Sequence, residues 1–289
     1  MAERRAVRAA FGAADEQERS ALVAFLAAGD PDMETTVETA RAAAEAGADV
    51  LELGVPFSDP LADGPIIQAA YTRALSGGFR MDALLEALER IAPLGPPVVL
   101  MTSLNPVLAR GLGRFCRDAA ASGASGILVP DLLPEDAGEL RGAARERGLD
   151  TVFLAAPGIS EERLAAAAGA SMGFLYLISR RGVTGPDGGV GEGLEEEVAR
   201  ARRHARTPVA VGFGVTSAED AARVARAADG VIVGSALVRA ARRACREGGA
   251  AAAARAVGAK VGELAEGIRS AAPGMRTGDD EDINEERQG

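Results

Sequence analysis

Two acidic residues, Glu52 and Asp63, have the type and spacing needed for acid–base chemistry. Glu52 lies in the apolar run "DVLELGV", and Asp63 follows eleven residues later in the proline-rich stretch "GVPFSDPLADGP". Alternation along a strand places Glu52 on the face opposite the two leucines. If the leucine face packs on helices, Glu52 points inward, and its burial raises its pKa. The two carboxyls can then take different protonation roles near neutral pH.

Each of these acids also has a purely structural interpretation. The strand alone equally supports a Glu52 held in an internal salt bridge. Asp59 and Asp63 stand beside prolines, where aspartates commonly cap helices or form Asx turns. Only the pairing with Glu52 favours a chemical role for Asp63.

Eight β-rich runs, each followed by a helical segment, predict the framework that positions the acids. The runs are residues 21–29, 49–55, 97–103, 126–131, 151–157, 173–179, 208–214 and 230–236. Eight such units in order predict an α/β protein with a closed parallel (β/α)8 barrel, a TIM barrel. An open doubly wound sheet is the alternative, but no glycine-rich dinucleotide fingerprint follows the first run.

The barrel is expected to form one domain over residues 1–270. An extra helix is predicted within residues 1–20 and another at 80–92, before the third strand. The acidic segment 271–289 is predicted to be a disordered tail. Four helices are predicted to end at glycines, which favour helix C-termini: Gly47, Gly123, Gly148 and Gly169.

Composition excludes several classes of function. The 289 residues are 47% hydrophobic and carry a formal net charge of −10, which argues against a nucleic-acid groove. Cys116 and Cys245 lack metal-site spacing, and no run resembles a signal peptide or a membrane span, so a cytoplasmic location is expected.

The only lysine, Lys260, falls in the last helix, and the only histidine is His204. A Schiff-base lysine at the strand ends and a three-histidine metal site are therefore excluded. Proton transfer by carboxylates remains, and no metal is expected.

Small residues after the last two strands predict a phosphate site. The segments "VGFGVTS" (211–217) and "VGSALV" (233–238) place backbone N–H groups and helix N-termini at neighbouring strand ends. The glycine-rich segment 179–193 is interpreted either as an active-site lid or as a simple flexible linker.

Four segments, "LELGVPFSDPLADGP", "YLISRRGVTG", "GFGVTS" and "VGSALV", closely resemble the tryptophan synthase alpha chain family, and the similarity runs over residues 20–268. The resemblance implies retro-aldol cleavage of indole-3-glycerol phosphate to indole and glyceraldehyde 3-phosphate, a carbon–carbon lyase reaction without a cofactor in this chain. It implies that Glu52 protonates the indole ring carbon and takes a proton from the glycerol hydroxyl. Asp63 would accept the indole N–H.

The same resemblance assigns residues to substrate binding. Tyr176 would line the pocket near the acid, and Thr184 would close onto the aspartate. Phosphate contacts would come from Gly185, Gly214, Gly234 and Ser235. Phe25, Ile67 and Leu128 are expected to wall the indole, although ordinary core packing explains these apolar positions equally well.

A pyridoxal-phosphate beta chain is the implied partner, in an αββα complex in which the alpha chain alone is slow. Pro56 and Asp59, with the segments "SLNP" and "VPDLLPED", are expected to face it. Ser103 and Leu104 depart from the family, which often has aromatic residues there, and the lost volume is expected to affect the pocket or the interface. Alternatives are a stand-alone indole lyase, a regulatory subunit with little chemistry, and another sugar-phosphate barrel enzyme.

Overall fold

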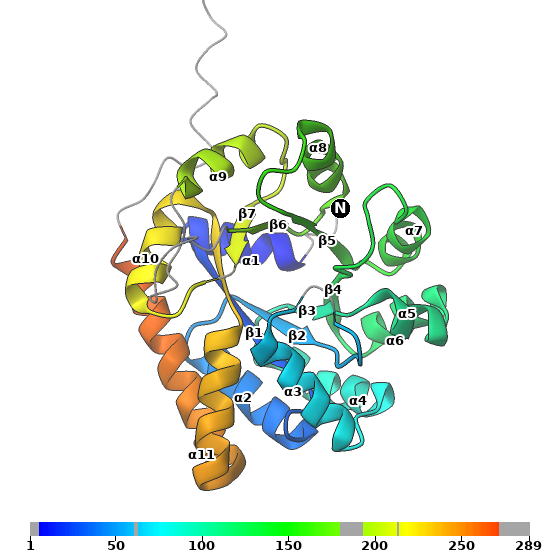
Figure 1. Ribbon diagram of the computed structural model, residues 1–289, viewed down its shortest axis with the longest axis vertical. Coiled ribbons are helices and arrows are strands. Elements are labelled where there is room, and N and C mark those ends of the chain that lie inside the picture. The colour runs from blue at the N-terminus through cyan, green and yellow to red at the C-terminus, as the bar shows by residue number, and fades with distance from the viewer. Residues whose placement is uncertain (1–5, 61–62, 180–192, 213, 272–289) are drawn as a thin grey trace, which may run out of the picture.

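The structure, a computed structural model, describes residues 6–60, 63–179, 193–212 and 214–271. Its strands form a closed parallel barrel in chain order, in which β8 pairs with β1. The predicted TIM barrel is therefore confirmed, and Figure 1 shows the helices surrounding the strands. The eight strands are β1 (Ala21–Ala27), β2 (Val50–Gly54), β3 (Val98–Met101), β4 (Ala124–Leu128), β5 (Asp150–Ala155), β6 (Leu175–Ile178), β7 (Val209–Gly212) and β8 (Gly230–Val233).

The helices include both of the predicted extra ones, α1 and α4. In order they are α1 (Ala6–Asp15), α2 (Met33–Glu45), α3 (Pro65–Ser76), α4 (Met81–Ile91), the 3₁₀ turn η1 (Ala92–Leu94), α5 (Leu104–Arg110), α6 (Leu112–Ala121), α7 (Gly138–Glu146), α8 (Glu161–Ala170), α9 (Leu194–Arg202), α10 (Ala218–Ala227) and α11 (Ser235–Arg269). Helix α11 consists of two helical parts that meet at a kink at Gly248 and Gly249.

Capping explains where several helices begin and end. Asp32 caps α2 by accepting a 2.7 Å hydrogen bond from the Thr35 N–H. Gly47, Gly123 and Gly148 follow their helices with positive φ, as predicted. Gly169 is a correction, because it lies inside α8, and Ser171 caps that helix.

Two layers of apolar side chains hold the barrel together. One lies between the strands and the surrounding helices and includes Leu51 and Leu53. The other fills the barrel interior, where Val50 packs with residues of α1. A Cβ atom at Gly230, the first residue of β8, would lie 2.5 Å from the ring of Phe11. Helix α1 therefore closes the barrel at the amino ends of the strands, which leaves the carboxyl ends available for a site (Figure 1).

The predicted boundary at residue 270 falls just after α11, and the predicted acidic tail lies almost wholly outside the described residues. Within the described ranges, no helix is both long and apolar enough to cross a bilayer.

Candidate active site

Glu52 lies on the inner face of β2, in register with Phe25 of β1 and Val99 of β3. Its side chain is 1% exposed and lines a cavity at the carboxyl ends of the strands. The inward orientation predicted from strand alternation is confirmed. Among the described residues, no cation pairs with Glu52, and its Oε2 atom has no hydrogen-bond partner. The internal salt bridge therefore receives no support from this part of the chain.

Asp63 reaches the same cavity from the loop that follows β2. The amide of Gln68 donates a 2.9 Å hydrogen bond to the Asp63 carbonyl, which ties the end of this loop to α3. Gly64 occupies the N-cap position of α3, and no side chain caps this helix. Asp63 is therefore not the helix cap that the alternative interpretation suggested.

Burial raises the pKa of both carboxyls, and it raises that of Glu52 further. It raises the pKa of Glu52 to about 8, with a further contribution from the negative charge of Asp63. Burial alone raises the pKa of Asp63 to about 6. Near pH 7, protonated Glu52 and ionised Asp63 therefore predominate in the pair.

Most of the predicted substrate residues meet at this cavity. Those that line it with the two acids are Phe25, Ile67, Tyr176, Gly214, Gly234 and Ser235. Leu128 is fully buried in the barrel interior and is not among the residues that line the cavity, which agrees with its alternative interpretation as ordinary core, so its contact with the indole stays a prediction. Thr184 and Gly185, with most of the predicted lid, lie outside the described residues.

The last two strands bring an anion-binding geometry to the cavity. Gly214 lies in the loop after β7 with φ +88°, a conformation that favours glycine. Gly234 directly precedes α11, so Ser235 stands at the N-terminus of that helix. Unpaired backbone N–H groups and the positive end of a helix dipole favour a phosphate group at such a position.

Several residues that line this cavity were not predicted from the sequence. They are Gly64, Pro65, Ile66, Met101, Leu154, Ile178, Val215 and Ile232. Tyr71 of α3 was not predicted either. It does not line this cavity but lines a smaller one beside it, with Asp63 and Ser103. Strand alternation could have indicated Leu154 and Ile178, whereas nothing in the sequence shows which face of α3 is turned to the acids.

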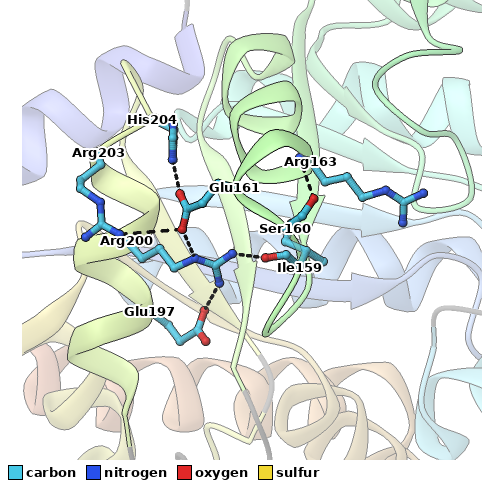
Figure 2. Close-up of polar contacts among 8 residues, drawn as sticks. All are labelled: Ile159, Ser160, Glu161, Arg163, Glu197, Arg200, Arg203 and His204. Carbon is cyan, nitrogen blue, oxygen red and sulfur yellow. Dashed lines mark hydrogen bonds and ion pairs between the residues drawn. The ribbon is translucent and has the colours of Figure 1, made fainter.

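The lone histidine and the lone lysine lie away from the cavity, as their exclusion from the chemistry requires. Figure 2 shows His204 beside the carboxylate of Glu161, which also accepts a 2.7 Å hydrogen bond from Arg200. These two partners, His204 first, lower the pKa of Glu161 to about 2. Lys260 pairs with Glu263 on α11. Among the described residues, no three His, Cys, Asp or Glu side chains are grouped as metal ligands.

The two residues predicted to face a partner differ in exposure. Asp59 is exposed and accepts a 2.8 Å hydrogen bond from the Ser58 hydroxyl. Pro56 is buried, but it lines a second groove with Pro106 and Arg110 of α5. The loop after β2 and the segment after β3 therefore share one surface.

Comparison with known proteins identifies the family. The sequence profile described as "Tryptophan synthase alpha chain" matches residues 11–269. The chain belongs to this family. The tryptophan synthase alpha chain of Nocardia farcinica is 44% identical over 261 residues, which cover 90% of this chain and 95% of the relative. That of Synechococcus elongatus is 47% identical over 235 residues, covering 81% and 88%.

Solved structures of this family have the same fold. Mycobacterium tuberculosis tryptophan synthase matches with a TM-score of 0.83 and 41% identity, over 92% of this chain and 99% of that one. The alpha subunit from Legionella pneumophila matches with a TM-score of 0.82 and 32% identity, over 92% and 99%. A tryptophan synthase complex from Pyrococcus furiosus matches with a TM-score of 0.76 and 38% identity, over 86% and 99%.

Proposed function

We propose that this chain is a carbon–carbon lyase that cleaves indole-3-glycerol phosphate to indole and glyceraldehyde 3-phosphate. The observation that carries the proposal is the convergence of Glu52, Asp63 and the N-terminus of α11 on one cavity. An acid, a carboxylate and a phosphate-binding helix end are the three groups that this cleavage requires.

The different pKa values of the acids support an ordered proton transfer. At pH 7 the protonated Glu52 donates its proton to the indole ring carbon, and positive charge develops on the ring nitrogen. The ionised Asp63 accepts the indole N–H and stabilises this charge. Glu52, now a carboxylate, takes the proton of the glycerol hydroxyl. The carbon–carbon bond then breaks toward the ring, and an aldehyde forms.

The remaining lining residues have positioning roles in this proposal. Gly214, Gly234 and Ser235 hold the phosphate. Phe25 and Ile67 pack on the indole, and Tyr176 limits the space beside Glu52. The chain itself needs no organic cofactor or metal for these steps, because both proton transfers use Glu52.

The proposal includes a pyridoxal-phosphate beta chain as the acceptor of indole, in an αββα complex in the cytoplasm. Two of the three large apolar residues that are most exposed in the described ranges lie at or next to the segments expected to face this partner. Leu133, 48% exposed, lies in "VPDLLPED", and Leu108, 54% exposed, lies in α5 two residues beyond "SLNP". The Asp131 carboxylate accepts a 2.9 Å hydrogen bond from the Leu104 N–H, which joins the two segments. An apolar surface of this kind suits a protein interface.

The test is indole release from indole-3-glycerol phosphate by Glu52→Gln. Because the amide cannot transfer the proton, we expect a loss of about a hundredfold or more. The control is Glu45→Gln on the exposed end of α2, which should retain full activity. Near-normal cleavage by Glu52→Gln would refute the acid–base role. Assays with and without a beta chain distinguish the complex from a stand-alone lyase.

A further inference from the structure

Tyr71 lies in α3, behind the wall that carries the two acids. Its side chain is 2% exposed and packs with Phe25, Ala27 and Val238. Neither the reaction proposed above nor the family resemblance gives this residue a role. It is one of only two tyrosines in the chain, and the other, Tyr176, lies in the cavity itself.

The hydroxyl of Tyr71 points toward β2 near Glu52. A Cβ atom at Gly54 would lie 2.3 Å from Tyr71 Oη, so the hydroxyl occupies the space that glycine leaves free. Gly54 is two residues beyond Glu52 and shares its face of the strand, because side chains alternate along β2. The hydroxyl therefore lies beside the next position on the same face of β2 as Glu52.

The same tyrosine lines a small cavity of mixed polar and apolar character with Asp63. The cavity, of about 10 Å³, is also lined by Thr102, Ser103 and Asp131. This volume is close to the minimum for one water molecule, and the lining offers several hydrogen-bonding groups. Tyr71 is the one aromatic side chain that lines it among the described residues.

The Tyr71 hydroxyl is neutral, as a hydrogen-bond donor must be. Burial first, then the charges of Asp63 and Glu52, raises the pKa of Tyr71 well above its ordinary value. The phenol therefore keeps its proton throughout the working range of the acids. A neutral phenol beside a carboxylate acts as a hydrogen-bond donor.

We propose that Tyr71 is a positioning residue, whose hydroxyl is linked to the Asp63 carboxylate through one water molecule in this cavity and holds the carboxylate facing Glu52. Donation to the charged form stabilises the ionised aspartate. The expected effect of Tyr71 on the reaction rate rests on the proposed function. Its expected effect on the pKa of Asp63 does not.

The main test is Tyr71→Phe, which keeps the ring and removes the hydroxyl. We expect the pKa of Asp63, followed by carbon-13 NMR of labelled carboxyl groups, to rise by about one unit. The acid limb of the pH profile of kcat/KM should move upward by the same amount. The control is Thr72→Val, which removes a hydroxyl from the next position of α3. Within the described part of the chain, this hydroxyl donates a hydrogen bond to the Gln68 carbonyl alone. An unchanged Asp63 pKa in Tyr71→Phe, or an equal shift in Thr72→Val, would overturn the proposal.

A second measurement leaves Tyr71 in place. With 3-fluorotyrosine incorporated at both tyrosines, the fluorine signal of residue 71 should titrate with a midpoint near 6, the pKa of Asp63, and this step should vanish in Asp63→Asn. A signal that ignores the Asp63 titration would refute this link. If the wild-type chain failed to cleave indole-3-glycerol phosphate, the proposed function would fail, while both NMR readouts would still decide the role of Tyr71.

Discussion

Tyr176 of β6 lies over Gly212 of the neighbouring strand β7, so closely that a Cβ atom at Gly212 would be 2.4 Å from Tyr176 Oη. The residue in register with Gly212 is Ile178, two positions farther along β6. The ring of Tyr176 therefore leans along its strand into the space that the glycine provides. The absence of a side chain at position 212 thus sets where Tyr176 lies in the cavity.

Gly212→Ala should displace Tyr176 and lower kcat/KM for indole release by about tenfold. Overpacking should also lower the free energy of unfolding by about 1–3 kcal/mol. Steady-state kinetics and thermal unfolding measure the two effects. Gly142→Ala in α7 is the control, because its Cβ atom would have no neighbour within 4 Å and it should not reduce activity. Wild-type kinetics in Gly212→Ala would show that this contact does not position Tyr176.

The pH profile of kcat/KM for indole release should be bell-shaped. Asp63 must be ionised and Glu52 protonated at the start of the cycle, so kcat/KM should rise through a pH of about 6 and fall through about 8. Because the carboxyls interact, these are apparent values of the pair. Asp63→Asn should remove the acid limb and lower the maximum. A profile that is flat from 6 to 8 in the wild type would contradict the protonation states assigned to the pair.

Stability should also respond to Glu52, in the direction opposite to that of a salt-bridged acid. The carboxyl loses its proton near its ordinary value of 4.5 in the unfolded chain but near 8 in the folded one. Between these values the folded state binds more protons, so stability falls as pH rises. Glu52→Gln does not titrate. Its Tm relative to wild type should therefore rise from pH 4.5 to 8 and then level off. The gain in free energy of unfolding should be on the order of a few kcal/mol. A difference that is constant with pH would mean that Glu52 is not buried as described.

Leu108 and Leu133 should carry part of the docking energy for a beta chain. Leu108→Asp and Leu133→Asp should each weaken alpha–beta association by tenfold or more, on the order of 1.4 kcal/mol, because a charge replaces apolar contact area. The basal cleavage rate should not change. The control is Leu75→Asp, the same substitution at a leucine of α3 that is 38% exposed and lies outside the segments expected to face the beta chain. Association constants from calorimetry give the comparison, and equal effects at all three positions would argue against a specific surface.

Local sequence patterns were sufficient for the barrel and for the two acids. Each strand of the barrel is a short β-forming run, and Glu52 occupies an alternate position within one of them. These are properties of neighbouring residues, and backbone geometry converts them directly into an inward-pointing side chain. The prediction for Gly169 failed because a glycine inside a helix and one at its end look alike in sequence.

Depth inside the barrel and contacts between distant segments were decided only by the tertiary structure. Leu128 and Ile178 are both apolar strand residues, but the tilt and stagger of the strands bury the first in the interior and bring the second to the cavity. Tyr71 lines a cavity with Asp63 because α3 packs against β1 with one particular face, which brings the tyrosine hydroxyl to Gly54 of β2. Strand alternation tells which side of the sheet a residue faces. The level it reaches along the barrel axis, and the helix face opposite it, depend on how all eight units pack together.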